Sequence, residues 1–312
     1  MDLEVIVPTY NRCASLERTL LSILKVPIPD CHSLSVIVAD NKSTDNTKQV
    51  VEAHIPSFHG RLRYVAATKG QGSSFARNAG ILATKSELLA FIDDDEELDA
   101  KWAETAFRSL SDPAIDYLGG RCEPVWEATP PPWVDHPNTR TGLGWADFGS
   151  LPRGFQEADF PGVLLSGNSV IRRRCFDRIG LYSESLGRSG NRLMGAEDTE
   201  VHERLRMAGF HGLYLPDLVV QHYIPASRLT KRYMRRWAFW TSVSTVRMIL
   251  PRPEAGPKWF GLPRYMYGRL LRSPFQLIRS ALAGQPAETF HHELNIWRFM
   301  GTFYGKHFYR GE

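Results

Sequence analysis

Asp93, Asp94 and Asp95 stand side by side in the sequence, directly after a run of five apolar residues. The apolar run is typical of a short buried strand. Three adjacent carboxylates cannot be buried without partners except at a large cost in free energy, so they are expected at a solvent-open strand end, beside a cation. Carboxylate oxygens next to a polyanion suit Mg²⁺ or Mn²⁺, which binds one or two carboxylates together with substrate phosphates. The stretch therefore predicts a divalent-metal site for a nucleoside diphosphate.

A structural interpretation of the same stretch stays open. Asp is a common N-cap residue, and Glu is favoured in the first turn of a helix, near its unpaired backbone N–H groups. The run from Asp93 to Glu97 could therefore simply begin a helix. The elements around it help to choose between the two interpretations.

The chain before Ala100 alternates between short apolar runs and helical patterns. The strand-like runs are Leu3–Val7, Leu34–Ala39, Leu62–Ala66 and Leu88–Ile92. Between them apolar residues recur at helical spacing, and proline, glycine or polar clusters mark the ends. This alternation predicts an α/β fold with a largely parallel central sheet and helices on both faces.

Polar clusters follow three of these strands, at Pro8–Arg12, Asp40–Asp45 and Asp93–Asp95. Each cluster alone is typical of an ordinary turn from a strand into a helix. The carboxyl ends of parallel strands meet at one edge of the sheet, where open α/β proteins bind ligands. Together the three clusters therefore favour a nucleotide site.

After Ala100 the pattern is less regular. The stretch from Arg121 to Phe160 is long for a connection in a compact domain, which indicates either a lid or acceptor wall or a mobile segment. Two short strands are expected later in the chain, at Leu213–Leu215 and Leu218–Gln221. The glycine-rich loop Leu186–Met194, a second candidate for acceptor contacts, leads into a helix.

Asp198 lies at or near the start of that helix. It can act as an N-terminal cap, or as a carboxylate held at the mouth of the site as a general base. Glu197 beside it is the competing candidate for the base. His222 follows the last predicted strand, and a lone histidine is usually structural or exposed.

The amino-acid composition limits the classes of protein to which the chain can belong. The chain has 312 residues, 43% of them hydrophobic and 23% charged, which is typical of a globular protein with a full core. The four cysteines are scattered without CxxC spacing, which argues against a zinc site or a disulfide scaffold and fits a reducing compartment. We see no signal-peptide pattern and no apolar stretch long enough to span a bilayer. A cytoplasmic location is expected.

Charge divides the chain into an acidic and a basic part. Residues 226–312 hold 15 Lys or Arg against four Glu and no Asp, a local net charge of +11, which leaves −7 for residues 1–225 of the whole-chain +4. In Leu229–Ile249 and Arg264–Ala283 the basic residues interleave with aromatic and apolar ones at helical spacing. We therefore expect a catalytic domain at residues 1–225 and a basic, amphipathic helical region at residues 226–312.

The basic region has two interpretations. Basic amphipathic helices rich in Trp and Phe commonly lie in the membrane interface, so peripheral contact through residues 229–283 with the inner face of the cytoplasmic membrane is one expectation. A helical cap packed on the core, with its basic side chains in water, is the other. No recognition motif for nucleic acid accompanies the basic residues, and none is expected as a partner.

Taken in order, the motifs resemble glycosyltransferase family 2. The matching segments are Val7–Arg12, Asp40–Asp45, Ala76–Gly80, Asp93–Asp95, Gly195–Glu200 and His222. The resemblance covers Leu3 to Pro225 and is specific as a set, although the Asp-x-Asp element alone is weak. It implies the GT-A fold, a nucleotide-sugar donor and inversion at the anomeric carbon.

The resemblance also implies a donor site. The residues that would bind the nucleoside or the sugar are Pro8, Thr9, Tyr10, Arg12, Asp40, Asn41, Asp93 and Asp94, with Asp40 bonded to the base. Lys42 departs from the family, in which a small or acidic residue is common. Lys69 and Arg77 could add positive charge near the leaving phosphates, although solvation at the surface explains them equally well.

For the chemistry, the resemblance implies that Asp93 and Asp95 form the Asp-x-Asp motif, with Asp95 the direct metal ligand. His222 would complete the metal site, and Asp198 would be the general base. Inversion requires one in-line attack by an acceptor hydroxyl, so a single carboxylate that takes its proton suffices. A bound Mg²⁺ or Mn²⁺ would neutralise the charge that grows on the leaving phosphates.

The sequence therefore predicts a metal-dependent, inverting glycosyltransferase that uses a nucleotide sugar, with a UDP-sugar as the expected donor. Its acceptor is expected in a surface polysaccharide or a lipid-linked glycan. One alternative is a nucleotidyltransferase, which would usually carry a glycine-rich basic loop in place of Pro8–Arg12. The other is a catalytically silent binding or assembly subunit that keeps the fold.

Overall fold

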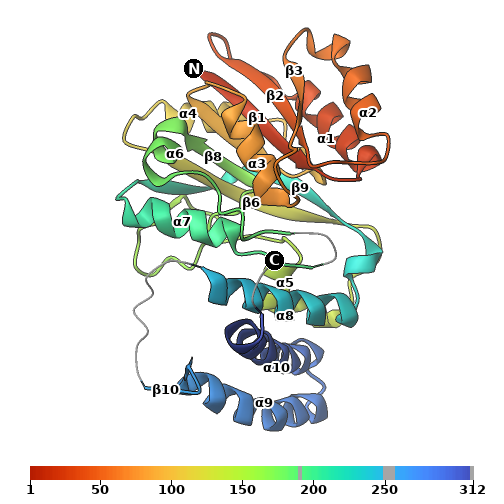
Figure 1. Ribbon diagram of the computed structural model, residues 1–312, viewed down its shortest axis with the longest axis vertical. Coiled ribbons are helices and arrows are strands. Elements are labelled where there is room, and N and C mark those ends of the chain that lie inside the picture. The colour runs from red at the N-terminus through yellow and green to blue at the C-terminus, as the bar shows by residue number, and fades with distance from the viewer. Residues whose placement is uncertain (189–191, 249–256, 310–312) are drawn as a thin grey trace. The chain divides into compact units, whose positions relative to one another are not determined.

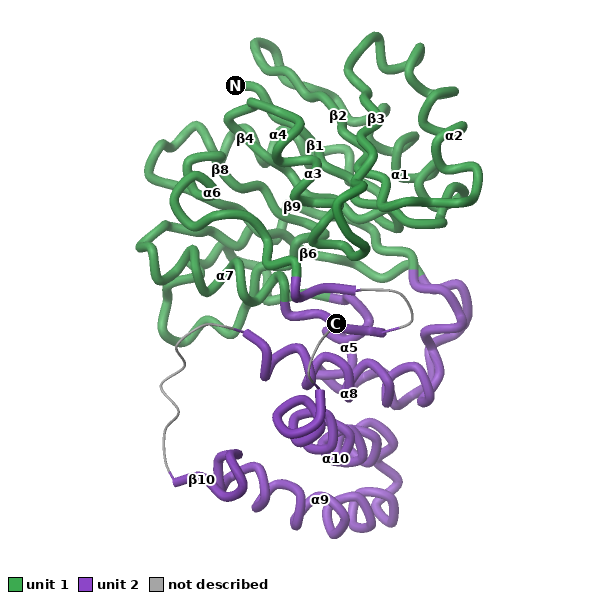
Figure 2. Tube along the Cα trace, viewed as in Figure 1, with its two compact units in different colours: residues 1–125, 146–184, 197–223 green, residues 126–145, 185–196, 224–312 purple. Residues whose placement is uncertain are grey.

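A computed structural model of the chain describes residues 1–188, 192–248 and 257–309. They form two compact units (Figure 2). Unit 1 consists of Met1–Val125, Ala146–Glu184 and Glu197–Tyr223, and unit 2 of Trp126–Trp145, Ser185–Ala196 and Ile224–Glu312. Unit 1 thus ends near the predicted boundary at residue 225, but two earlier segments cluster with the C-terminal region.

Unit 1 is built on a mixed sheet with the strand order β3-β2-β1-β4-β8-β6-β9-β5, and β7 pairs with β9 (Figure 1). The strands are β1 (Asp2–Thr9), β2 (Ser33–Asp40), β3 (Leu62–Ala66), β4 (Leu88–Ile92), β5 (Glu96–Leu98), β6 (Tyr117–Trp126), β7 (Arg153–Gly154), β8 (Asn168–Arg172) and β9 (Gly212–Ile224). Strands β1 to β4 pair in parallel, as predicted. The antiparallel pairing of β8 with β4 and β6 was not predicted.

Helices cover both faces of this sheet, which confirms the predicted α/β class. They are α1 (Cys13–Lys25), α2 (Thr47–His54), the 3₁₀ turn η1 (Pro56–Phe58), α3 (Ser73–Leu82), α4 (Trp102–Leu110), α6 (Arg173–Ile179) and α7 (Glu197–Met207). Strand β4 lies in the middle, and its residues alternate between two apolar clusters. Ala90 packs in the cluster of α1 and α4, whereas Phe91 packs in the cluster of α6 and α7.

The two short strands expected around Pro216 are one continuous strand, β9. That prediction was wrong because proline interrupts a strand only where its missing N–H is needed by a neighbour. Pro216 falls between the residues of β9 that pair with β7 and those that pair with β5. Gly120 of β6 allows the backbone of β9 to come close, because a Cβ at this position would lie 1.9 Å from the Leu218 carbonyl oxygen of β9.

Unit 2 is mostly helical. It contains η2 (Pro132–Asp135), α5 (Pro137–Gly142), η3 (Ala226–Arg228), α8 (Lys231–Arg247), the short hairpin β10 (Lys258–Trp259) and β11 (Leu262–Pro263), α9 (Arg264–Leu282) and α10 (Pro286–His307). Helix α10 packs between α8 and α9 (Figure 1). The two predicted basic helices correspond to α8 and α9; Ile249, the expected end of the first, lies outside the described residues. No helix among the described residues is long and apolar enough to cross a membrane.

Two histidines of unit 2 predict a pH-dependent stability. The rings of His136 and His291 stack with centroids 3.8 Å apart, and the His136 ring accepts a bond from the Asn138 N–H. Burial, together with His136 and Arg298, lowers the pKa of His291 to about 3. In the unfolded chain the pKa of a histidine is about 6.5. Between the two pKa values the unfolded chain therefore binds more protons than the folded protein does. The free energy of unfolding therefore decreases as the pH falls below the pKa of the unfolded histidine.

We expect the urea midpoint, followed by circular dichroism, to fall steadily from pH 7 to pH 5 in the wild type. In His291→Gln the decline should be shallower because the uncharged amide has no proton to bind. His211→Gln, which replaces an exposed histidine, serves as the control and should decline as the wild type does. Parallel curves for all three proteins would contradict this origin of the pH dependence.

Candidate functional site

The three aspartates lie in the turn from β4 into β5, at the edge where β1 also ends. The Thr9 hydroxyl donates to Asp94 Oδ2 at 2.8 Å. One Arg12 nitrogen, Nη1, donates both to Asp94 Oδ1 at 2.6 Å and to Asp95 Oδ2 at 2.8 Å. Burial raises the pKa of Asp94 to about 6, although the Arg12 charge acts the other way. Arg12 is thus the cation that allows these carboxylates to lie together.

Arg77 is a second cation, buried in α3. Its Nη2 lies 2.8 Å from Asp93 Oδ1, and its Nη1 lies 3.2 Å from Glu197 Oε1. Burial alone would lower the pKa of Arg77, but the carboxylates of Asp93, Asp198 and Glu197 raise it above its ordinary value. Ser73, at the start of the same helix, donates to Glu197 at 3.0 Å. Arg77 therefore joins the end of β4 to the start of α7.

Asp198 is held by a second set of contacts, through hydroxyl groups. The Ser166 hydroxyl donates to Asp198 Oδ1, and the Tyr182 hydroxyl lies 3.0 Å from the Ser166 oxygen. Burial, followed by the charge of Glu197, raises the pKa of Asp198 to about 6. The carboxylate is therefore fixed in position, and its pKa is shifted toward neutral pH, as a general base needs.

Glu96 is a buried carboxylate of the site to which the sequence analysis assigned no role. Its Oε2 accepts a bond from the Asp93 N–H at 2.8 Å, and burial raises the pKa of Glu96 well above its usual range. A Cβ on Gly167 would lie 2.4 Å from Glu96 Oε1. The one available signal was the length of the acidic run, because five adjacent acids cannot all reach solvent from a strand.

His222 lies opposite Glu96 in the antiparallel pair of β9 with β5. Its Nε2 is 3.6 Å from Asp95 Oδ2, so the histidine and the predicted metal ligand are neighbours. Across the described residues no group of three or more His, Cys, Asp or Glu is arranged to hold a metal ion. The donor chemistry nevertheless fits, because two carboxylates and an imidazole suit Mn²⁺ or Mg²⁺, provided that Asp93 and Asp95 turn from their arginines.

The cluster after β2 joins the same edge. The Asn11 side chain accepts a bond from the Thr44 N–H at 2.7 Å, and the Cys13 N–H donates to Asp45 at 3.0 Å. The three polar clusters therefore converge, as the sequence predicts. Lys42 has a φ of 66° in this turn, a left-handed conformation that Asn, Asp and Gly adopt more readily than Lys.

The remaining predicted donor residues differ in what they contact. Asp40 is buried and accepts bonds from the Tyr64 hydroxyl at 2.6 Å and the Ser43 N–H at 2.9 Å. The amide of Asn41 bonds the backbone of the following loop, at Gly70 and Gly72. Tyr10 is exposed, and Pro8 lies inside β1 beside the edge. Lys69 is exposed and pairs with Glu184 at 2.9 Å.

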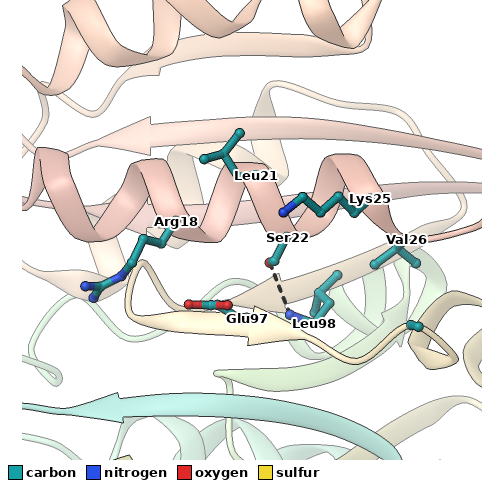
Figure 3. A pocket seen from close by; sticks show the side chains of 8 residues that line it. Arg18, Leu21, Ser22, Lys25, Val26, Glu97 and Leu98 are labelled. Atoms are coloured by element: carbon teal, nitrogen blue, oxygen red, sulfur yellow. Dashed lines mark hydrogen bonds between the residues drawn. The ribbon is translucent and has the colours of Figure 1, made fainter. Parts of the chain in front are cut away.

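Unit 1 also has a pocket of about 430 Å³ (Figure 3). It is lined by Arg18, Leu21, Ser22, Lys25, Val26, Glu97, Leu98 and Ala100. The Leu98 N–H donates to the Ser22 hydroxyl at 3.2 Å, which joins α1 to β5 beneath it. None of the predicted site residues lines this pocket, and we assign it no part in catalysis.

The site thus combines the acidic, arginine-balanced edge of an α/β sheet with a buried carboxylate at the start of a helix. The model of the family "Glycosyl transferase family 2" matches residues 4–180. The chain belongs to this family, which confirms the resemblance that its motifs suggested. The enzyme class and the GT-A fold are confirmed with it.

Two relatives are similar over most of the chain. The glycosyltransferase AglE of Haloferax volcanii is 24% identical over 232 residues, 74% of this chain and 70% of AglE. The succinoglycan biosynthesis protein ExoM of Rhizobium meliloti is 25% identical over 241 residues, 77% of this chain and 72% of ExoM.

The fold is similar to that of the mannosyltransferase PcManGT from Pyrobaculum calidifontis, solved in complex with GDP-Man and Mn²⁺. The TM-score is 0.65 at 18% identity, with 98% of this chain and 87% of PcManGT covered. At this identity the similarity establishes the fold alone.

The buried position of Arg77 predicts a large loss of stability in Arg77→Gln. The variant would leave the carboxylates of Asp93 and Glu197 without their cation, and breaking a buried ion pair from one side costs about 3–5 kcal/mol. Lys69→Gln, which removes an exposed ion pair, should cost about 0–1 kcal/mol. Urea unfolding curves would measure both, and similar small losses would show that Arg77 does not support the site.

Proposed function

We propose that the chain is a metal-dependent, inverting glycosyltransferase in which Asp198 is the general base. The observation that carries this proposal is the arrangement around Arg77. This one buried guanidinium binds Asp93, from the predicted metal site, and Glu197, the neighbour of the predicted base. The two halves of an inverting site are therefore held at a fixed spacing in unit 1.

The transfer would proceed in one step. An acceptor hydroxyl attacks the anomeric carbon from the side opposite the diphosphate, and the new C–O bond forms as the donor's C–O bond breaks. The electron pair of that bond leaves with the nucleoside diphosphate, and the hydroxyl proton passes to Asp198. Ser166, which donates to one oxygen of Asp198, would orient the carboxylate and leave its other oxygen for the acceptor.

Glu197 is the weaker candidate for the base. Its Oε1 already accepts from both Ser73 and Arg77, and a base in a tight ion pair is a poorer proton acceptor. In this proposal Glu197 positions Arg77 instead.

Asp93, Asp95 and His222 would hold a Mg²⁺ or Mn²⁺, which would supply Lewis-acid stabilisation of the leaving phosphates when bound. To bind the metal, Asp93 and Asp95 would exchange their arginine partners for the cation. Arg12 and Arg77 pair with these carboxylates, and Arg12 is half-buried. The Mn²⁺ in the complex of PcManGT supports the same cofactor here.

The donor would be a nucleoside diphosphate sugar bound by Pro8, Thr9, Tyr10 and Arg12, with Asp40 and Asn41 shaping the base pocket. A UDP-sugar remains the prediction, although PcManGT was solved with GDP-Man. The name of ExoM supports a role in polysaccharide synthesis. A glycan or a lipid-linked saccharide would be the acceptor, which fits an enzyme that works peripherally at the inner face of the cytoplasmic membrane.

The donor can be identified without the acceptor. A panel of UDP- and GDP-sugars incubated with Mn²⁺ should show slow release of one nucleoside diphosphate, abolished by EDTA. Asp95→Asn should lower this release at least about a hundredfold, because loss of a metal ligand removes several kcal/mol of stabilisation. Asp217→Asn, at an exposed position of β9, should match the wild type. Metal-dependent nucleotide binding with no release, even in the presence of glycan acceptors, would favour the silent-subunit alternative.

The assignment of the base predicts a split between binding and turnover. Asp198→Asn should lower kcat of transfer by about 10²–10⁴ while the Kd of the donor stays near that of the wild type. Ser166→Ala should give a smaller loss, because the carboxylate remains but is no longer oriented. A variant Glu197→Gln that lowered kcat more than Asp198→Asn would reverse the two assignments.

A further inference from the structure

Helix α9 turns a mixed side inward, on which Ser273 and Ser280 alternate with the half-buried Leu270 and Leu277. Its buried residues are two serines, Ser273 and Ser280. Four of its large apolar side chains point away from the protein and are exposed, by 77% for Leu271, 70% for Phe275, 58% for Ile278 and 86% for Leu282. A soluble helix usually places such residues against the core, so this arrangement requires an explanation.

The exposed apolar residues form one face. Positions 271, 275, 278 and 282 follow the spacing that brings side chains to the same side of a helix; we call these four residues the α9 face. The inward side is fixed by a bond between the hydroxyls of Ser280 and Thr289 of α10, 3.0 Å apart, and by the edge contact of Tyr267 with Phe299 of α10. The α9 face therefore has no partner within the described part of unit 2.

Charge accompanies the α9 face. From Lys258 to Leu282 the sequence contains five Lys or Arg and no Asp or Glu. Arg272 and Arg279 are seven residues apart, so they lie on the same side of the helix, next to Leu271 and Ile278 along the chain. The preceding hairpin adds the exposed Phe260, and Arg264, the first residue of α9, stacks 4.6 Å from the centroid of the Trp259 ring.

The apolar residues and the arginines together indicate which partner would cover the α9 face. A second copy of the chain, paired face to face, would bring the arginines of both copies together, and like charges at an interface are unfavourable. A bilayer with anionic lipids takes apolar side chains at the level of the acyl chains and arginines at the headgroups. The helix rises about 28 Å at 1.5 Å per residue, which is long enough to lie along a membrane surface.

We propose that α9 binds the interface of an anionic bilayer through Leu271, Phe275, Ile278 and Leu282, with Arg272 and Arg279 at the lipid headgroups. Helix α8, the other basic helix, does not share this role, because its Met234, Ala238 and Val243 are buried in unit 2. Binding to the bilayer does not depend on catalysis. Its purpose, to hold the enzyme near a lipid-linked acceptor, rests on the proposed function.

The test uses the full chain and vesicles of phosphatidylcholine with 30% phosphatidylglycerol at low salt. We expect the wild type to sediment with these vesicles, and not with pure phosphatidylcholine. The double variant Leu271→Glu/Phe275→Glu should bind more than tenfold more weakly, since two apolar side chains no longer enter the interface. Arg272→Gln and Arg279→Gln should each weaken binding about fivefold, as expected when one cation near anionic lipid is lost.

Leu82→Glu is the matched control, because Leu82 is an equally exposed leucine at the end of α3 in unit 1. It should bind as the wild type does. Unchanged circular dichroism and urea midpoints would show that the double variant folds. Equal vesicle binding by the double variant, or no binding by the wild type, would overturn the proposal. So would a wild-type dimer in analytical ultracentrifugation that the double variant dissociates.

Donor hydrolysis without vesicles separates this proposal from the proposed function. The double variant should release nucleoside diphosphate at the wild-type rate, since α9 contributes no residue to the site. Vesicle binding without hydrolysis by the wild type would overturn the proposed function alone. Hydrolysis without vesicle binding would overturn the role of α9 alone.

Discussion

The burial of Arg77 is the constraint on which the rest of the site depends. A guanidinium removed from water needs anions at hydrogen-bonding distance, and the two that it has come from distant parts of the chain, Asp93 after β4 and Glu197 at the start of α7. The start of α7 must therefore lie at the carboxyl edge of β4. Because Asp198 follows Glu197 directly, the same ion pair determines where the candidate base lies.

Six carboxylates crowd this edge, and their mutual repulsion has to be offset. They are Asp93, Asp94, Asp95, Glu96, Glu197 and Asp198. Arg12 and Arg77 supply two positive charges, while burial first, and neighbouring carboxylates second, raise the pKa values of Asp94, Glu96 and Asp198. A site with unbalanced negative charge attracts a divalent cation, so a protein that needs a metal for catalysis gains affinity for it from the same crowding.

The sequence predicts this edge because its signals are local. An apolar run that ends in three aspartates identifies both the strand and its solvent-open end, and three such clusters in parallel strands must meet. Ser166 could not be predicted in the same way. It stands in a loop ahead of β8, and its bond to Asp198 depends on an antiparallel pairing of β8 with β4 for which the sequence has no local signal. Glu96 was visible as part of an acidic run, but only the sheet shows that its side chain turns inward.

The C-terminal region shows the same limit for helices. Periodicity established that the segment from Arg264 to Ala283 is amphipathic, and it left open whether the apolar side packs on the protein or on a membrane. A periodic pattern defines two faces of a helix but does not say which one the protein covers. In α9 the structure answers this question: the small Ser273 and Ser280 are buried, and Phe275 is exposed. Small residues at a helix contact are therefore the signal to look for when a chain must keep a hydrophobic face free.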